Sequence, residues 1–242
     1  CNPCGIGSAD ALPEAYEKAF AADTQSPFGG IVAVNRTLDL ETARRINNVF
    51  TEIIIAPDFG DGVLDFLKKK RNRRLIRLDM ASLEKAGEPW ELKNLFHGYL
   101  LQEWDMVEDD PAQWKVVSRR QPDPREMNAM QFAWKVVSLL RSNAIAITGE
   151  DRVWGLGSGQ TSRIDSTHLA IWKARKFGHD LEGAVCASDG FFPFADSIEE
   201  LHRNGIKAVI EPGGSKGDEE VIRACDEYGI CLVFTGFRHF RH

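Results

Sequence analysis

Apolar residues recur along the chain in two alternating patterns, short continuous runs and longer runs with helical spacing. Continuous runs are typical of strands that are buried on both faces, and spaced runs are typical of helices that cover a sheet. The first half predicts strands at residues 30–34, 53–56 and 75–78, with helices at residues 40–50 and 63–67. Strands that alternate with helices predict β-α-β crossovers, and therefore an α/β class with a largely parallel sheet.

The second half repeats this pattern after an interruption. Between residues 102 and 126 the chain becomes acidic and contains prolines, which indicates a junction between two parts. A long helix is predicted from residue 124 to about residue 141, and more strands follow at residues 144–147, 153–156, 184–186, 207–210 and 230–234. We therefore expect two α/β/α lobes, residues 1–110 and residues 111–242, built alike.

Composition narrows the class of partner. Among the 242 residues, 30 Lys and Arg stand against 36 Asp and Glu, a net charge of -6 that does not favour nucleic acid. The basic run at residues 68–74 is interpreted as the solvated end of a helix. No apolar stretch is long enough for a bilayer, so we expect no membrane partner. Five scattered cysteines indicate free thiols in a reducing cytoplasm.

The opening stretch C-N-P-C-G-I-G allows several interpretations. Cys1 and Cys4 could pair with His239 and His242 as metal ligands, but structural zinc pairs lie closer in sequence, and no histidine forms the H-x-E of a zinc deaminase. We expect no metal there. A redox C-x-x-C is typical of a helix N-terminus after a strand, which this stretch is not. Two hypotheses stay open, an N-terminal-nucleophile amidohydrolase that uses Cys1 and a loop that shapes a pocket.

Two glycine-rich stretches each follow a predicted strand and precede a helix. Residues 155–160 are either a tight turn or a loop whose backbone approaches a ligand near Arg163. Residues 212–217 are either a helix cap or an anion site that uses Ser215 and its neighbouring amides. Neither stretch decides between its two interpretations alone.

Aromatic side chains gather in two segments that follow predicted strands. F-F-P-F at residues 191–194 follows S-D-G, and F-R-H-F-R-H at residues 237–242 interleaves cations with rings. In open α/β folds ligands bind at the carboxyl ends of the strands, and clustered aromatics suit a flat ring. These segments predict a binding site for an aromatic ligand.

Together these stretches resemble the AICAR transformylase domain of the AICAR formyltransferase/IMP cyclohydrolase family. The resemblance covers essentially the whole chain, in order. Its motifs are N-P-C-G at residues 2–5, S-P-F-G-G at 26–30, E-I-I-I-A-P at 52–57, R-S-N-A-I at 141–145, G-S-G-Q-T-S-R-I-D-S at 157–166, A-S-D-G-F-F-P-F at 187–194, P-G-G-S at 212–215 and F-R-H-F-R-H at 237–242.

The resemblance implies two cytidine-deaminase-like lobes without zinc, and a cytoplasmic homodimer with shared active sites. It implies transfer of the formyl group of 10-formyltetrahydrofolate to the 5-amino group of AICAR, giving FAICAR, with an IMP cyclohydrolase domain on the same or another chain. In the family pattern K-H-x-N-P-C-G, a catalytic Lys-His pair lies just before Cys1, which makes Cys1 and Cys4 loop residues. A third hypothesis is a non-catalytic AICAR- and folate-binding remnant.

The AICAR amine is a poor nucleophile, so its attack needs a base and a cation that stabilises the oxyanion. The resemblance assigns these roles to the upstream pair, and it assigns orientation of the amine and carboxamide to Asn143 and His242. The resemblance also allows a monovalent cation such as potassium near Asp189. The residues that the resemblance assigns to AICAR are Phe28, Gly29, Glu52, Asn143, Arg163, Phe191 and Arg238, and those assigned to the folate are Ile164, Pro193, Asp196, Ser215 and Lys216.

Overall fold

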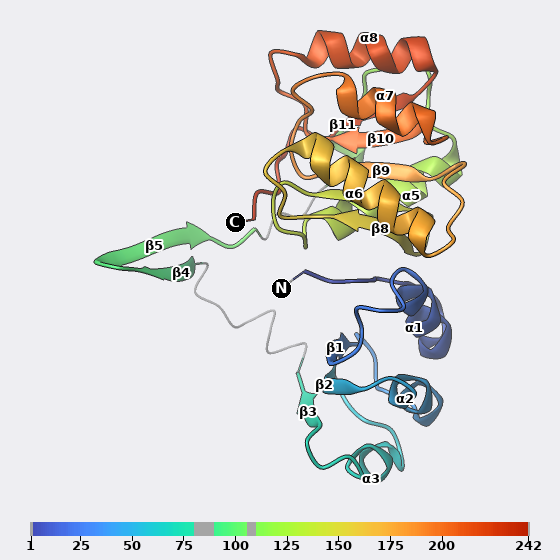
Figure 1. Cartoon of the computed structure of the whole chain (residues 1–242), viewed down its shortest axis with the longest axis vertical. Coiled ribbons are helices and arrows are strands. Elements are labelled where there is room, and N and C mark those ends of the chain that lie inside the picture. Colours follow the sequence, from blue (N-terminus) through green and yellow to red (C-terminus); the bar gives the residue numbers. More distant parts are fainter. Residues whose placement is uncertain (1, 80–89, 106–109, 242) are drawn as a thin grey trace. The chain divides into compact units, whose positions relative to one another are not determined.

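The structure, a computed structural model, describes residues 2–79, 90–105 and 110–241 and divides into two compact units (Figure 1). The small unit contains residues 11–13 and 25–108, and the large unit contains residues 1–10, 14–24 and 109–242. The division after residue 108 falls in the predicted junction, but the opening residues group with the second half of the chain. The assignment of the units to two transformylase lobes stays a prediction.

The small unit contains a three-stranded sheet in which both pairs of neighbours are parallel. Its elements are β1 (Gly30–Ala33), α2 (Leu40–Asn47), β2 (Thr51–Ala56), α3 (Val63–Leu67) and β3 (Arg74–Arg77). Asp39 caps α2, since its Oδ1 accepts a hydrogen bond of 2.8 Å from the Thr42 backbone. The strands and helices that the apolar pattern predicts in this half are confirmed.

An antiparallel hairpin, which the pattern did not predict, also belongs to the small unit. Strands β4 (Trp90–Leu95) and β5 (Gly98–Glu103) are joined by Phe96 and His97. Tight hairpins are usually announced by Asn-Gly or Asp-Gly, and this turn has neither signal. Many of its apolar side chains are exposed to solvent, so no buried face imposed a pattern on the two strands.

The large unit is built on six strands in the order β6-β11-β10-β9-β7-β8. They are β6 (Lys115–Val116), β7 (Ile145–Thr148), β8 (Val153–Gly157), β9 (Val185–Ser188), β10 (Ala208–Glu211) and β11 (Cys231–Phe234). Strands β9, β10 and β11 are parallel, whereas β6 and β7 run antiparallel to their neighbours. The predicted parallel sheet is confirmed at the centre, and antiparallel strands complete its two sides.

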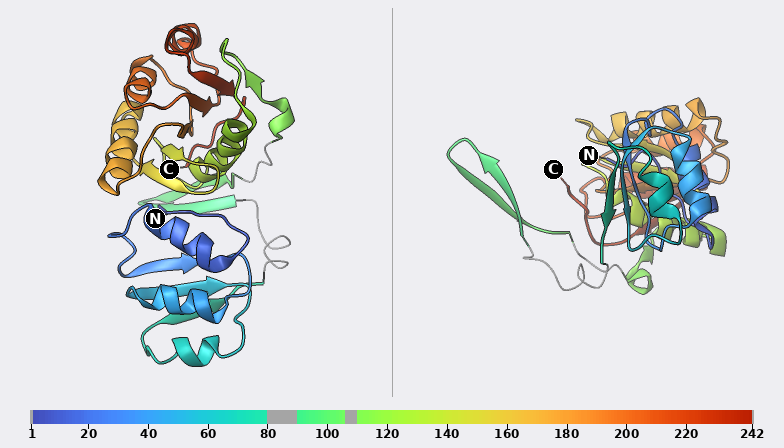
Figure 2. Two further views of the ribbon diagram at one scale, coloured as in Figure 1. Left: turned by 90° about the vertical axis from the view of Figure 1, so that its right-hand side faces the viewer. Right: turned by 90° about the horizontal axis from the view of Figure 1, so that it is seen from below.

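Helices cover both faces of this sheet (Figure 2). Along β10, Ala208 and Ile210 join the core beneath α5 (Pro124–Val137), whose Trp134 is almost fully buried, while Val209 joins the opposite core. That alternation is the two-residue period of a strand buried on both faces. The opposite face is covered by α6 (Arg163–Lys176), α7 (Asp196–Arg203) and α8 (Asp218–Tyr228). The large unit is therefore a three-layer α/β/α sandwich, as predicted.

Glycines in β8 allow α6 to pack closely on the sheet. A Cβ atom on Gly155 would overlap the carbonyl oxygen of Ala170, and one on Gly157 would overlap that of Ser166. Gly155 and Gly157 are therefore explained by helix packing, which was neither of the two interpretations of residues 155–160.

The opening segment lies along β8. Ile6 accepts a 3.0 Å hydrogen bond from the Val153 backbone, and Ser8 donates one of 2.7 Å to Asp151. A Cβ on Gly5 would overlap the carbonyl oxygen of Ala19 in α1 (Leu12–Ala21). The N-P-C-G stretch is thus a packed loop of the large unit.

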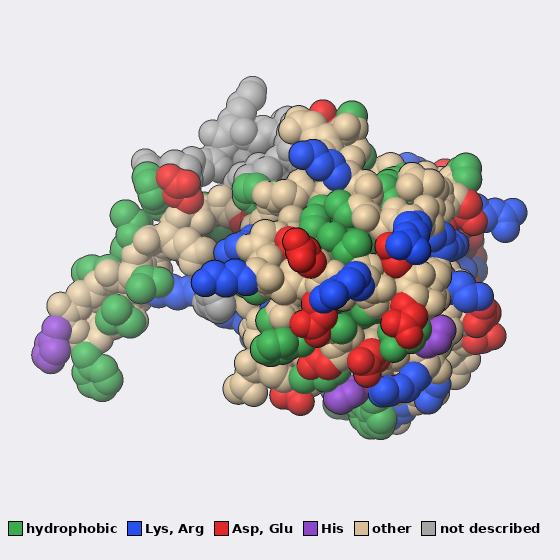
Figure 3. Space-filling view, turned by 90° about the horizontal axis from the view of Figure 1, so that it is seen from above, with side chains coloured by type: hydrophobic (Ala, Val, Ile, Leu, Met, Phe, Trp, Pro, Cys, Tyr) green, Lys and Arg blue, Asp and Glu red, His purple; other side chains and the backbone are tan. Residues whose placement is uncertain are grey.

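The surface carries charges of both signs. In the view onto α7 and α8, acidic and basic side chains are intermixed (Figure 3). Such a surface gives no extended field of one sign on this face. Among the described residues, no helix combines the length and the apolar character that crossing a membrane requires.

Candidate functional site

Strand register brings five loops of the large unit to one edge of its sheet. Ile145 of β7 pairs with both Gly157 of β8 and Ser188 of β9, and Glu211 at the end of β10 pairs with Phe234 at the end of β11. The segments that flank these positions therefore start at the same edge. We call this the loop edge and define it as residues 141–144, 158–166, 188–196, 211–218 and 235–241.

Asn143 lies just before β7 and is held by the loop that follows β8. Its Nδ2 donates to the carbonyl oxygens of Gln160 at 3.1 Å and Thr161 at 3.3 Å, and its own carbonyl accepts from Ser166 Oγ at 2.8 Å. Because both neighbouring groups are hydrogen-bond acceptors, the side-chain atom of Asn143 that faces them must be the amide nitrogen. Asn143 therefore offers Oδ1 to a ligand as a hydrogen-bond acceptor. His242, the other predicted catalytic residue, lies outside the described residues.

Arg163 and Asp189 form a buried ion pair. Arg163 Nη2 lies 2.6 Å from Asp189 Oδ1, and their side chains are 10% and 0% exposed. Arg163 Nε also donates to Ser188 Oγ at 2.7 Å, and Ser142 Oγ donates to Asp189 Oδ2 at 2.5 Å. Much of the Arg163 guanidinium is therefore bound inside the protein, where its charge is balanced and its position is fixed.

Arg238 is exposed and lies against aromatic rings. Its guanidinium carbon is 4.8 Å from the centre of the Phe191 ring and 5.8 Å from that of Phe240, distances typical of cation–π contacts. Gly190 makes room for this arrangement, because a Cβ there would lie 2.6 Å from both Arg163 Nη2 and Phe240. The loops after β9 and β11 thus present a ring and a cation together, as the sequence predicted.

The P-G-G-S turn is capped by a carboxylate of the chain itself. Asp218 accepts hydrogen bonds from the backbones of Gly214 at 2.8 Å and Ser215 at 2.9 Å. The carboxylate of Asp218 thus occupies the turn amides considered for an anion, whereas the N-cap residue of α8, Gly217, makes no side-chain capping hydrogen bond. A Cβ on Gly217 would lie 2.6 Å from the carbonyl oxygen of Pro193, so the turn packs against the 191–194 loop.

The remaining folate candidates also lie at the loop edge. Ile164 is half-buried in the first turn of α6, and Lys216 is exposed beside Ser215. Asp196 is exposed at the start of α7, where its Oδ1 accepts a 2.7 Å hydrogen bond from Ser197. The structure therefore brings the whole folate set to one edge.

Three further AICAR candidates gather in the small unit. The ring of Phe28 lies 5.4 Å from that of Phe50, and Gly29, with a φ of 73°, donates a 2.8 Å hydrogen bond to the Phe50 carbonyl. Glu52 is the second residue of β2, which follows Phe50, and its carboxylate is 3.7 Å from Arg74. A hollow of about 500 Å³ adjoins them, lined by Phe50, Glu52, Arg71, Asn72, Arg73 and Arg74.

The potassium ion predicted near Asp189 stays a prediction, and both oxygens of that carboxylate already have protein partners. The Arg163 guanidinium already lies 2.6 Å from one of its oxygens, so the carboxylate is neutralised, and Ser142 donates to the other oxygen. A second cation would meet the positive charge of Arg163 at short range. Within residues 2–79, 90–105 and 110–241, no group of three or more His, Cys, Asp and Glu side chains could hold a metal ion.

Sequence reasoning gave no role to several residues that organise this edge. Asp189 was considered only for an ion, although it holds Arg163 and Ser142. His239 is buried, its ring is 4.6 Å from that of Trp134, and its backbone donates to the Asp189 carbonyl at 3.0 Å. The sequence did contain a signal for Asp189, because a polar residue directly follows the apolar strand in V-C-A-S-D at residues 185–189.

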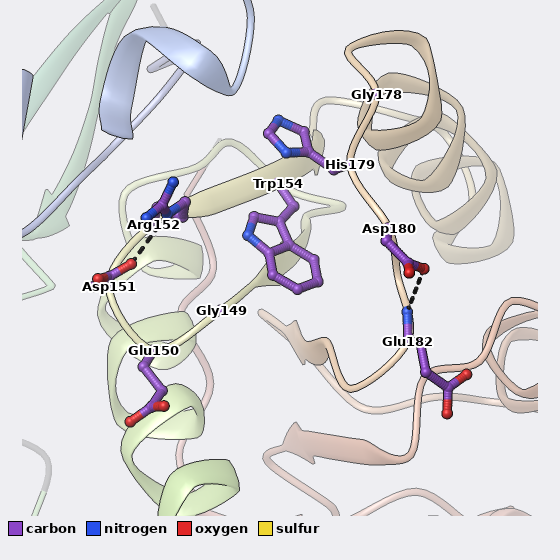
Figure 4. A pocket seen from close by; sticks show the side chains of 9 residues that line it. All are labelled: Gly149, Glu150, Asp151, Arg152, Trp154, Gly178, His179, Asp180 and Glu182. Carbon is purple, nitrogen blue, oxygen red and sulfur yellow. Dashed lines mark hydrogen bonds and ion pairs between the residues drawn. The ribbon is translucent and has the colours of Figure 1, made fainter. Parts of the chain in front are cut away.

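A second hollow lies at the opposite edge, beside the β7–β8 turn (Figure 4). Its volume is about 460 Å³, and the rings of Trp154 and His179 stack beside it with centroids 6.3 Å apart. Asp151 pairs with its neighbour Arg152 at 3.1 Å. None of the predicted site residues lines this hollow.

The cysteines that the structure describes are all free thiols. Burial raises the pKa of Cys4, and the nearby Asp23 carboxylate raises it further. A raised pKa keeps a thiol protonated and unreactive, which favours the loop interpretation of Cys4. Cys1, the nucleophile of the amidohydrolase hypothesis, lies outside the described residues.

A sequence model of the family described as "AICARFT/IMPCHase bienzyme" matches residues 1–173. The chain belongs to this family. The "Bifunctional purine biosynthesis protein PurH" of Chlorobaculum parvum is 51% identical over 241 residues, which cover 100% of this chain and 46% of that protein. Proteins of the same name from Chloroflexus aurantiacus and Streptococcus thermophilus are 48% and 47% identical, over 100% of this chain and 47% and 46% of theirs. The chain thus spans about half the length of these relatives.

Solved structures that resemble the chain include deaminases. A dCMP deaminase from the cyanophage S-TIM5 in apo form has 14% identity and a TM-score of 0.34, over 46% of this chain and 98% of that one. A diaminohydroxyphosphoribosylaminopyrimidine deaminase/5-amino-6-(5-phosphoribosylamino)uracil reductase from Thermotoga maritima has 18% identity and a TM-score of 0.32, over 44% and 36%. Membership of the AICARFT/IMPCHase family rests on the sequence match.

Proposed function

We propose that this chain performs the transformylase reaction of its family in purine biosynthesis. It transfers the formyl group of 10-formyltetrahydrofolate to the 5-amino group of AICAR and gives FAICAR. The observation that carries this proposal is the convergence of Asn143, Phe191, Arg238 and the P-G-G-S turn at the loop edge. They come from separate loops, and the family resemblance assigns them to the two substrates.

The reaction needs a proton acceptor beside the amine and a cation beside the formyl oxygen. In the family pattern K-H-x-N-P-C-G, a Lys-His pair precedes the N-P-C-G loop, separated from it by the one residue that Cys1 occupies here. Asn2 of that loop accepts a 2.9 Å hydrogen bond from the Arg141 backbone, two residues before Asn143. A pair attached there would enter the loop edge next to Asn143. We infer that its His removes the amine proton and that its Lys stabilises the tetrahedral oxyanion.

For AICAR we assign separate tasks to the residues of the loop edge. Asn143 Oδ1 accepts a hydrogen bond from the carboxamide, and the Phe191 ring stacks on the imidazole. Arg238 is exposed and binds the phosphate, whereas two nitrogens of Arg163 are already bound by Ser188 and Asp189. Arg163 then acts mainly by fixing its neighbours. Phe28, Gly29, Glu52 and His242 stay predictions as further AICAR contacts.

For the folate we assign the second half of the same edge. Asp196 has an exposed carboxylate that suits the donor groups of a pterin. Pro193, Ser215 and Lys216 belong to the two loops that pack together, and Ile164 supplies apolar surface beside them. This arrangement would place the formyl donor next to the AICAR residues.

We further propose that a second copy of the chain covers the β4–β5 hairpin. Apolar side chains are exposed along the hairpin (Figure 3). They are Trp90, Leu92, Leu95, Phe96, Tyr99, Leu100 and Leu101. An isolated two-stranded hairpin is marginally stable in water, and so large an apolar surface marks an interaction site. The family resemblance implies a homodimer, so we infer that the partner that covers this hairpin is a second copy of the chain.

The dimer is tested with a double variant of a cross-strand pair. Leu92 and Leu101 face each other across the hairpin and are each 59% exposed. Leu92→Lys with Leu101→Lys should give a monomer in analytical ultracentrifugation, while Leu139→Lys, at a 48% exposed leucine elsewhere, should leave the dimer intact. A double variant that still dimerises would overturn the proposal.

A direct assay tests the reaction. The full-length protein is incubated with AICAR and 10-formyltetrahydrofolate, and FAICAR and tetrahydrofolate are quantified by mass spectrometry. Formation of both in equal amounts supports formyl transfer. Calorimetric binding of AICAR without turnover supports the remnant hypothesis, and labelling of a mature Cys1 amine by an electrophile supports the amidohydrolase. From the family resemblance we also propose a cytoplasmic location and an IMP cyclohydrolase domain on the same or another chain.

A further inference from the structure

Glu211 is the last residue of β10, and its side chain is fully buried at the loop edge. The family resemblance assigns it no role. Its Oε2 accepts a 3.0 Å hydrogen bond from the Phe192 backbone. Its Oε1 is buried and has no hydrogen-bond partner among the described residues. Because Glu211 directly precedes the 212–217 turn in the chain, its carboxyl ties the backbone of the 191–194 loop to the base of that turn.

These are the two loops assigned to the folate and the AICAR ring. Phe192 lies between Phe191 and Pro193, and its own side chain is fully buried, so Glu211 fixes the backbone of a residue whose ring is already anchored. Gly213 begins the turn that leads to Ser215. The two loops also touch directly, since a Cβ on Gly217 would meet the Pro193 carbonyl.

We propose that Glu211 is a positioning residue whose buried carboxyl clamps the 191–194 loop to the 213–217 turn and thereby sets the spacing of the folate-binding groups. This proposal rests on the proposed function. Groups that hold substrates must be fixed to a fraction of an ångström, which a hydrogen bond to a core-anchored backbone provides.

The burial of Glu211 and the charges around it predict that the free energy of unfolding depends on pH. The pKa of Glu211 is raised to about 8, chiefly by burial and to a smaller extent by the Asp218 carboxylate, against the opposing effects of the Phe192 backbone donor and Arg163. The other titratable groups facing it are the thiols of Cys186 and Cys225, whose pKa values are raised by burial and by Glu211. At neutral pH the clamp is therefore a protonated acid surrounded by protonated thiols.

The sign of this dependence follows from where the proton is held. The ordinary pKa of a glutamate is 4.5, so between pH 4.5 and about 8 the folded protein keeps a proton that the unfolded chain has lost. The contribution of Glu211 to the free energy of unfolding therefore falls as pH rises through this window and levels off above it. Glu211→Gln keeps an acceptor for the Phe192 backbone donor and has no proton to lose, so it should remove this slope.

The test compares Glu211→Gln and Glu211→Ala with wild type in the full-length protein, and Glu182→Gln serves as an exposed control. Hydrogen exchange is measured by mass spectrometry over residues 188–194 and 212–217, and the free energy of unfolding is followed from roughly pH 5 to 9. Glu211→Ala should speed exchange in both loops more than in α5, and it should raise KM for 10-formyltetrahydrofolate roughly tenfold. Glu211→Gln should retain wild-type exchange and KM while it flattens the pH dependence of stability.

The proposal is overturned if Glu211→Gln weakens folate binding as much as Glu211→Ala does. It is also overturned if Glu211→Ala leaves exchange in both loops unchanged. Should Glu211→Ala not fold, the pH dependence of Glu211→Gln decides, and a slope equal to that of wild type overturns the proposal. Absence of formyl transfer in wild type refutes the proposed function instead, and exchange and pH dependence still report on the clamp.

Discussion

The loop edge of the large unit and the Phe28–Glu52 cluster of the small unit hold predicted AICAR residues in opposite physical states. At the loop edge, Arg163 and Asp189 form an ion pair with side chains 10% and 0% exposed. In the small unit, Phe28 is 74% exposed, and Glu52 and Arg74, 3.7 Å apart, have side chains 50% and 66% exposed. The first region is ordered by its own protein contacts, and the second has little that would hold it before a ligand or partner arrives.

This contrast separates two ways of preparing a binding site. A buried charge that loses its partner is strongly destabilising, so the loop edge is fixed in position when the protein folds. Exposed ion pairs contribute little, because water screens them and their side chains lose entropy on pairing. Substitutions of the buried residues at the loop edge should therefore affect stability and turnover together, whereas substitutions of exposed residues, including those in the small unit, should affect substrate binding alone.

The largest effect is expected for Asp189→Ala. The substitution leaves the Arg163 guanidinium buried without its counter-charge and removes the acceptor of Ser142 Oγ. The free energy of unfolding should fall by about 3–5 kcal/mol, measured by urea denaturation. The control is Glu182→Ala, which removes an exposed pair with Lys207 at 2.9 Å and should cost about 0–1 kcal/mol. Equal effects of the two variants would contradict the contrast.

Arg238→Ala should weaken AICAR binding with little effect on stability. The side chain is exposed, so the fold does not depend on it, but a charged hydrogen bond to phosphate contributes about 1.5–3 kcal/mol. KM for AICAR should rise while KM for the folate stays near wild type. Arg238→Lys keeps the charge and should recover part of the affinity. If the Ala variant bound AICAR as tightly as wild type does, Arg238 would not be the residue that binds the phosphate.

Asn143→Ala should lower kcat/KM more than either cysteine variant does. Loss of Oδ1 removes an acceptor for the substrate carboxamide, at a cost of about 1–3 kcal/mol in the transition state. Cys4→Ser should leave turnover nearly unchanged, because the raised pKa of the Cys4 thiol rules out a reactive thiolate at neutral pH. Cys1→Ser should behave in the same way under steady-state kinetics. If Cys4→Ser abolished transfer while Asn143→Ala did not, the site assignment would be wrong.

The same contrast explains what could be predicted from sequence. Central strands such as β10 were predicted because burial on two faces leaves an uninterrupted apolar run, whereas the exposed strands β4 and β5 were not predicted. The antiparallel direction of β7 relative to β8 and β9 was not predicted, since an apolar run looks alike in parallel and antiparallel strands. Whether the Arg163 guanidinium is free to bind a ligand also depends on Asp189, which is 26 residues away in the chain. A local sequence motif does not reveal such a pairing. Residue types at the site were therefore predictable, and their protein partners were not.

The smallest effect is expected for Arg74→Ala in the small unit. Arg74 and Glu52 are 3.7 Å apart and exposed, so breaking the pair should change the free energy of unfolding by no more than about 0.5 kcal/mol. The informative measurement is KM for AICAR, with Glu52→Gln assayed beside it. If Glu52 contacts AICAR, Glu52→Gln should raise that KM, while Arg74→Ala should leave it unchanged or lower it, because Glu52 loses a competing partner. A loss of stability above about 1 kcal/mol in Arg74→Ala would show that this region is ordered by its own contacts, as the loop edge is.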